Sequence, residues 1–221
     1  MRTAVALVLM AWPAAVWAGS VTGRVSVVDK GGKPATDPQE TAVWIDDIKL
    51  KAKPGNATIN ATVQMRGKAF VPRLAPVALG GTVTFPNLDP ILHNAFSVSG
   101  ENRFDLDLYK SPKSGSKTFL VPGIVRVYCN IHPQMSAVVL VLDSPYFIQA
   151  GPDGAFTLEG VPAGKHVLKA WHERGGEAST EILVPAGDGR VSAELQLDAS
   201  TFKRTSHKKK DGKDYGSGES Y

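Results

Sequence analysis

The sequence of 221 residues is poor in cysteine, histidine and methionine, with one, five and four of them respectively. A single cysteine, Cys129, excludes an internal disulfide framework. No segment after residue 18 is an apolar run of the roughly 20 residues that a bilayer-spanning helix needs. A helical period of useful length is also missing there, so neither a membrane bundle nor a helical domain is expected.

An excess of charge of one sign is also missing from most of the chain. The formal net charge is +4, of which Arg2 contributes one unit and residues 199–221 contribute three, so residues 19–198 are neutral. Without a basic face, the folded part is not expected to bind nucleic acid. The composition, 43% hydrophobic and 21% charged, is that of a globular chain.

The first 18 residues have the pattern of a secretory signal peptide. Arg2 is followed by an apolar run over residues 4–12 and then by small residues. We predict cleavage after Ala18 and a periplasmic or secreted mature protein. The alternative, a permanent membrane anchor, is disfavoured because the apolar run is too short to span a bilayer. In an oxidising compartment, Cys129 must be buried and inert, paired between chains, or bound to a metal.

The chain is rich in the two residues that interrupt regular structure, with 22 glycines and 15 prolines. Between residues 61 and 142, strand-like segments and turns recur about every ten residues, which is typical of a β-sandwich. The predicted strands include residues 62–65, 82–85 and 137–142. We therefore predict an all-β chain with a Greek-key sandwich over residues 61–143 and a second, smaller sandwich over residues 144–198. Residues 51–60 are predicted to be a linker, and residues 199–221 a disordered basic tail.

The only cysteine lies among other side chains that bind metals. Cys129, His132 and Met135 follow one another at intervals of three residues, and His93 precedes them. A thiolate, two imidazoles and a weak thioether are the donor set of mononuclear copper sites that transfer electrons. A strand followed by a tight loop can bring three ligands to one point. We expect His93 to join them from a neighbouring strand.

Each of these residues also has an ordinary explanation. A lone buried cysteine is commonly a small hydrophobic residue, a loop histidine is commonly solvated, and a methionine near a strand commonly belongs to the core. Their joint occurrence around the only cysteine of an exported chain favours a metal site. Zinc is a weaker candidate than copper, because methionine is not among the ligands of structural zinc sites.

Residues 61–143 resemble the cupredoxins, in particular the amicyanin- and plastocyanin-like blue copper proteins. Besides the loop from Cys129 to Met135, the resemblance rests on His93, Asn94 and the residues before them, which include Phe70, Pro72, Leu74, Val77, Gly80, Gly81, Val83, Phe85, Asn87 and Asp89. It implies one copper ion per chain, bound by His93, Cys129, His132 and Met135. It also implies that Asn94 hydrogen-bonds to the loop carrying Cys129, and that His132 is the ligand nearest the solvent.

Residues 151–171 resemble the second half of a carboxypeptidase regulatory-like, transthyretin-like sandwich. Residues 21–45 have the strand, turn and strand pattern of its first half. We therefore expect a discontinuous sandwich, with the copper domain inserted between its two halves. The alternative is that residues 19–50 add strands to the copper domain.

The function that follows is one-electron transfer between periplasmic redox proteins, and not catalysis. Multicopper enzymes need further metal centres with many more histidines, whereas this chain has five and no closely spaced pair of them. Two alternatives use the same residues: a copper storage or delivery protein, and a metal-free assembly module in which Cys129 is inert. The run Lys208–Lys210 could contact an acidic surface, although a solvated tail is the simpler interpretation.

Overall fold

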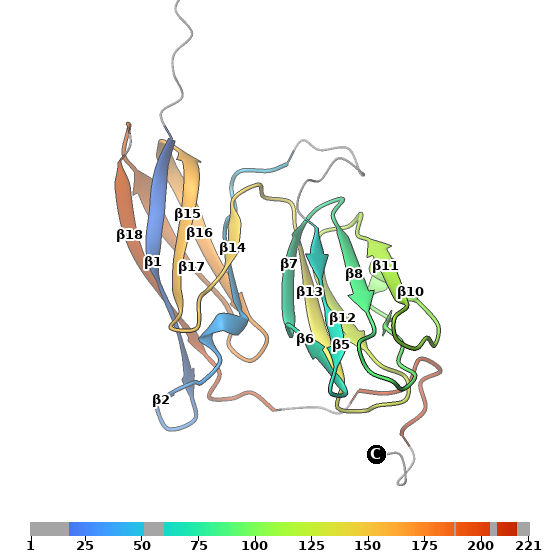
Figure 1. Ribbon diagram of the computed structural model, residues 1–221. Coiled ribbons are helices and arrows are strands. Elements are labelled where there is room, and N and C mark those ends of the chain that lie inside the picture. Colours follow the sequence, from blue (N-terminus) through green and yellow to red (C-terminus); the bar gives the residue numbers. More distant parts are fainter. Residues whose placement is uncertain (1–17, 51–59, 188, 204–206, 216–221) are drawn as a thin grey trace, which may run out of the picture.

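The computed structural model describes residues 18–50, 60–187, 189–203 and 207–215. Most of the predicted signal peptide and linker lie outside these ranges. The described chain consists of two β-sandwiches that lie side by side (Figure 1), with two short 3-10 helices, η1 (Pro38–Glu40) and η2 (Gly100–Asn102), in the described part. The prediction of an all-β sandwich protein is confirmed. Among the described residues, no helix is long and apolar enough to cross a membrane.

The first sandwich, here called the central sandwich, is formed by residues 61–142. One of its sheets has the strand order β10 (Phe104–Asp105), β9 (Phe96–Ser97), β12 (Gly123–Tyr128), β13 (Ser136–Leu142) and β7 (Leu74–Ala78). The facing sheet has the order β11 (Ser114–Thr118), β8 (Thr82–Pro86) and β4 (Ala61–Thr62). A separate hairpin pairs β5 (Gln64–Arg66) with β6 (Ala69–Val71).

Strand β13 explains how the two sandwiches hold together. Its sequence from residue 137 to 142 is entirely apolar, and all of these residues are buried. Because side chains alternate along a strand, Ala137, Val139 and Val141 face the core of the central sandwich. Val138 and Leu140 face the opposite way, into a cluster with residues from both sandwiches, including Ala42, Trp44, Leu74 and Trp171. An apolar run without polar alternation is therefore what a strand buried on both faces requires.

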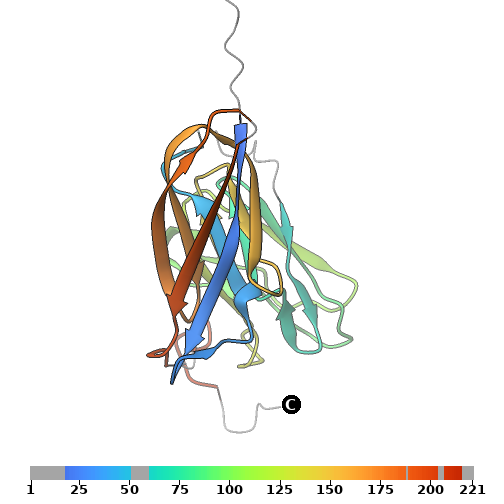
Figure 2. The ribbon, with the colours of Figure 1, turned by 90° about the vertical axis from the view of Figure 1, so that its left-hand side faces the viewer.

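The second sandwich, here called the outer sandwich, is built from both ends of the described chain. One sheet has the order β15 (Ala155–Pro162), β1 (Ala18–Asp29) and β18 (Arg190–Asp198), with β2 (Lys33–Pro34) paired to β1. The other has the order β14 (Phe147–Gln149), β3 (Thr41–Ile45), β16 (Gly164–His172) and β17 (Gly176–Val184). Figure 2 shows β1 and β18 running side by side in this sandwich.

The pairing of β1 and β3 places residues 18–45 in the outer sandwich. β1 is antiparallel to β15 and parallel to β18, and β3 lies between β14 and β16. The chain therefore leaves the outer sandwich after β3, forms the central sandwich, and returns at β14. Membership of the outer sandwich in the transthyretin-like family remains a prediction.

The C-terminal segment differs from the disordered tail that we expected over residues 199–221. Its described part, residues 199–203 and 207–215, crosses from β18 to the central sandwich (Figure 1) and contacts it there. The absence of large core residues predicts disorder. The segment is held instead by ring stacking and hydrogen bonds, which leave no periodic hydrophobic signal.

Candidate metal centre

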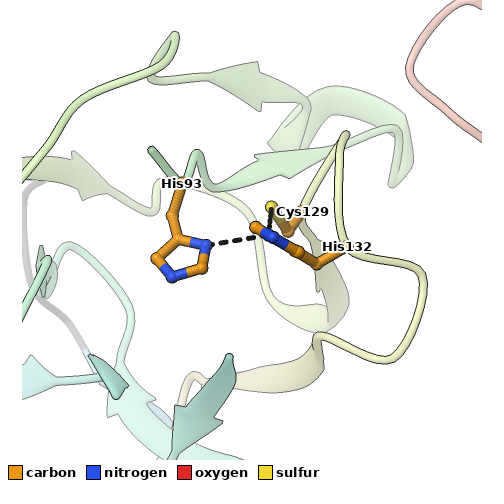
Figure 3. A group of neighbouring side chains, drawn as sticks. All are labelled: His93, Cys129 and His132. Atoms are coloured by element: carbon orange, nitrogen blue, oxygen red, sulfur yellow. Dashed lines mark hydrogen bonds between the residues drawn. The ribbon is translucent and has the colours of Figure 1, made fainter. Parts of the chain in front are cut away.

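Three of the predicted ligands meet at one end of the central sandwich. His93, Cys129 and His132 each offer one ligand atom, and the three atoms lie within 4.8 Å of one another. The two Nδ1 atoms of the histidines are 3.0 Å apart, and the sulfur of Cys129 is 3.6 Å from Nδ1 of His132. Figure 3 shows the two rings and the thiol turned toward a common point. His93 and Cys129 are fully buried, whereas His132 is 5% exposed.

The ligand loop is closed by its own backbone. Strands β12 and β13 are antiparallel, with Tyr128 opposite Ser136, so the chain reverses direction between them. The backbone N–H of Cys129 donates to the carbonyl of Met135, and that of Met135 donates to the carbonyl of His132, at 3.3 and 3.0 Å. His93 is fixed from another segment, because its backbone exchanges two hydrogen bonds with Tyr109.

Met135, the fourth predicted ligand, is fully buried in the same core cluster as Cys129. Its backbone is hydrogen-bonded to both Cys129 and His132. The residue is therefore placed beside the other three by the loop, and its role as an axial ligand stays a prediction.

Asp89 lies beside His93, a position that the sequence does not predict. Its Oδ2 lies 2.8 Å from Nε2 of His93, and the carboxylate also accepts backbone hydrogen bonds from Gly67 and Lys68 at 2.8 and 2.9 Å. Burial raises the pKa of Asp89, but the hydrogen bonds from Lys68, Gly67 and His93 outweigh it and hold the pKa below its usual value. An anionic Asp89 keeps a proton on Nε2 of His93 and leaves the lone pair of Nδ1 free for a metal.

Asn94 connects the two segments that carry ligands. Its side-chain oxygen accepts a hydrogen bond of 2.7 Å from the backbone N–H of Asn130, the residue after Cys129. Its amide nitrogen donates to Asp105 at 3.2 Å. The contact with Asn130 is of the kind that the cupredoxin resemblance implies for Asn94, and it restrains His93 and Cys129 relative to each other.

The tail adds contacts to the same loop that the sequence did not predict. The hydroxyl of Tyr215 donates a 2.6 Å hydrogen bond to the carbonyl of Cys129 and lies 2.9 Å from Nε2 of His207. The ring of His207 stacks on Tyr128, with centroids 4.1 Å apart and an interplanar angle of 13°. The available signal was the presence of a histidine and a tyrosine in an otherwise polar tail.

The donor set fits a borderline or soft metal ion. Two imidazole nitrogens and one sulfur converge in a buried site, and the set of two histidines and one cysteine is characteristic of electron-transfer copper. With Nδ1 of His93 free to accept, the bond between the two Nδ1 atoms needs a proton on Nδ1 of His132. As a ligand through Nδ1, the neutral ring of His132 would carry its proton on Nε2 instead.

A second cluster, formed by Asp37, Glu40 and His172, is better explained as an ion-pair network. Both carboxylate oxygens of Asp37 accept hydrogen bonds from Arg174, at 2.6 and 3.1 Å. Nδ1 of His172 accepts from the backbone N–H groups of Arg174 and Gly175, each at 3.2 Å. The proton of this neutral ring must therefore sit on Nε2, which cannot then bind a metal. Burial lowers the pKa of His172, which keeps the ring neutral.

No protein-family model matches the chain, and no curated protein matches it. Among solved structures, it is similar to a purple cupredoxin from Nitrosopumilus maritimus, at 21% identity and a TM-score of 0.34, over 37% of this chain and 99% of that one. It is also similar to a Cu(I) form of an amicyanin mutant, at 22% identity and a TM-score of 0.36, over 45% and 98% of the two chains.

A copper-containing nitrite reductase from Thermus scotoductus SA-01 is similar at 24% identity, with a TM-score of 0.37, over 52% of this chain. The present chain spans only 28% of the length of that enzyme. The copper named for the amicyanin and for the nitrite reductase belongs to those proteins. What the present chain binds has to be argued from its own side chains.

Proposed function

We propose that the protein is an exported type 1 copper protein that carries single electrons between redox partner proteins. The observation that carries the proposal is the convergence of His93, Cys129 and His132 in one buried site. Two imidazoles and a thiolate, with Met135 held beside them by the loop, match the donors of electron-transfer copper. Export is proposed from the signal-peptide pattern of residues 1–18.

Each residue around the site has a part in this proposal. When bound, copper supplies a centre that alternates between Cu(II) and Cu(I). Cys129 offers the strongly donating sulfur, and Asp89 orients His93 so that its free nitrogen faces the site. The hydrogen bond between Asn94 and Asn130 limits movement of the ligand loop. His132 is the ligand with measurable exposure and is the proposed entry point for electrons.

A catalytic role with further copper centres is disfavoured by the environment of the remaining histidines. His166 is hydrogen-bonded to Asp47 and to a backbone carbonyl, at 2.8 and 2.9 Å. His172 carries its proton on the nitrogen that faces Asp37, and His207 stacks on Tyr128. These three residues lie in different environments, so they do not form a second histidine cluster in the described chain. We therefore propose a carrier and not an enzyme.

Copper storage or delivery, the second candidate, would use the same ligands. Ion transfer to another protein needs ligands that the acceptor can reach, whereas His93 and Cys129 are fully buried. The burial of these ligands therefore favours electron transfer over transfer of the ion.

The test is the visible absorption spectrum of the mature protein loaded with Cu(II). A thiolate ligand of Cu(II) should produce an intense visible band, and Cys129→Ser should abolish it. Zn(II) is redox-inactive with a filled d shell, so the Zn(II)-loaded wild type is the control that should show no such visible band. Copper binding without the band would favour storage or delivery, and no copper binding would favour a metal-free module.

A further inference from the structure

Four hydrogen bonds form a closed ring beside the metal centre. Asn130 donates its backbone N–H to Asn94, and Asn94 donates its side-chain amide to Asp105, at 2.7 and 3.2 Å. Asp105 accepts from the ammonium of Lys210, whose backbone N–H donates to the side-chain oxygen of Asn130 at 2.9 Å. Since Asn94 and Asn130 directly follow ligands in the sequence, the ring joins both ligand-bearing segments to the C-terminal tail.

A second set of tail contacts involves Tyr128 and Cys129, the two residues before Asn130. Tyr215 has one hydroxyl proton, which it donates to the carbonyl of Cys129 at 2.6 Å. Its oxygen then accepts from Nε2 of His207 at 2.9 Å, and the ring of His207 lies flat on Tyr128. The tail thus contacts three consecutive residues, 128 to 130, at the point where β12 ends and the ligand loop begins.

We propose that residues 207–215 are an integral part of the metal centre, in which Lys210 and Tyr215 are positioning residues for the loop that carries Cys129. The inference rests on the proposed function for its consequences at copper, but the positioning itself concerns the protein alone. By clamping the loop from outside, the tail slows its opening and so slows release of a bound ion. The hydroxyl dipole of Tyr215, directed at the backbone carbonyl of Cys129, also stabilises the more electron-rich, reduced form of the site.

The alternative is that the tail merely rests on the surface. A tail that only rests on the surface would be held by exposed lysine ion pairs alone. The ion pair of Lys208 is an example of such a weak contact. The ammonium of Lys208 lies 3.9 Å from Asp214, with both side chains more than half exposed at 62% and 85%. Lys210 differs because it reaches Asp105, which is bound in turn to the buried Asn94.

The first experiment uses the metal-free full-length mature chain. Amide hydrogen exchange is measured at Asn130 in the wild type, Tyr215→Phe, Lys210→Ala and Lys210→Arg. Loss of one hydrogen bond should speed exchange at this amide about fivefold in Tyr215→Phe and Lys210→Ala. Lys210→Arg keeps a cation for Asp105 and should restore the wild-type rate, and Lys208→Ala is the control that should change nothing.

The second experiment uses the same variants loaded with Cu(II). Release of copper to a chelator should be about fivefold faster in Tyr215→Phe, and the reduction potential should be lower than that of the wild type. A tail with only a structural role would not change the potential while folding stays intact.

The two experiments separate failure of this inference from failure of the proposed function. Unchanged exchange at Asn130 in both Tyr215→Phe and Lys210→Ala would overturn the inference, whatever the protein binds. Faster exchange in a chain that takes up no copper would overturn the copper proposal alone and leave the positioning role in place.

Discussion

Replacement of Asp89 by asparagine tests whether the carboxylate behind His93 controls the metal centre. The two oxygens of Asp89 accept three hydrogen bonds, from the backbone N–H groups of Gly67 and Lys68 and from Nε2 of His93. Asparagine keeps the size but offers one oxygen, and its NH2 group must face at least one N–H donor. The arrangement with the smallest loss keeps Lys68 and His93 bonded and gives up the bond from Gly67.

The size of the effect follows from the bonds that change. A hydrogen bond to a charged group contributes about 1.5–3 kcal/mol, against about 0.5–1.5 kcal/mol for a neutral one. Since one charged hydrogen bond is lost and two become neutral, we expect Asp89→Asn to reduce the free energy of unfolding by about 2 kcal/mol. Loss of a carboxylate behind a ligating imidazole should also weaken Cu(II) binding by about 10–100-fold.

The assay is competition for Cu(II) with a chelator, together with urea unfolding of the metal-free chain. Asp107→Asn is the matched control, because Asp107 is exposed and its backbone φ of 56° suits asparagine. If Asp89→Asn lowered stability but bound Cu(II) within twofold of the wild type, the carboxylate would be only a structural clamp. The assignment of His93 as an oriented ligand would then lose its support.

Three further predictions test other parts of the molecule. Met135→Leu should retain copper and raise the reduction potential, and an unchanged potential in voltammetry would remove Met135 from the ligands. Leu140→Ala should lower the free energy of unfolding by about 2–4 kcal/mol in urea titration, because Leu140 is buried between the sandwiches. Ile124→Ala, on the paired strand and 38% exposed, should cost clearly less, and equal losses would argue against the interface. Burial raises the pKa of Asp37, but the hydrogen bonds and charge of Arg174 outweigh burial and lower the pKa below its usual value, so the stability that this ion pair contributes is present above the unfolded pKa of about 4. Stability should therefore fall as the pH drops below about 4, less steeply in Asp37→Asn, and an equal slope would contradict the role of this ion pair.

Strands with a strong local pattern could be predicted from the sequence, and short ones could not. The expected strands at residues 82–85 and 137–142 are β8 and β13 within one residue at each end. The expected strand at residues 62–65 is instead divided between β4 and β5, and β6 and β10 were not foreseen. Strands of two or three residues are too short to show a period, and tertiary pairing alone defines them.

In the candidate site, too, residues close in the sequence could be predicted, and contacts between distant residues could not. Cys129, His132 and Met135 could be grouped because they lie in one short loop, and His93 through the residues around it. The contacts of Tyr215 with Cys129 and of Lys210 with Asn130 span 86 and 80 positions in the sequence. No local pattern encodes a partner at such a distance, so the sequence alone predicts disorder for a tail without core residues.

The parallel pairing of β1 with β18 has a consequence for the order in which the molecule assembles. The first strand cannot pair with this neighbour until the residues from 190 onward have been synthesised. The central sandwich is complete at residue 142, so it can fold while β1 and β3 still wait with unpaired edges. Long-range closure of this kind is slow. The outer sandwich therefore closes late. Residues 207–215 follow β18 and reach the ligand loop only after this closure, as the last step of assembly.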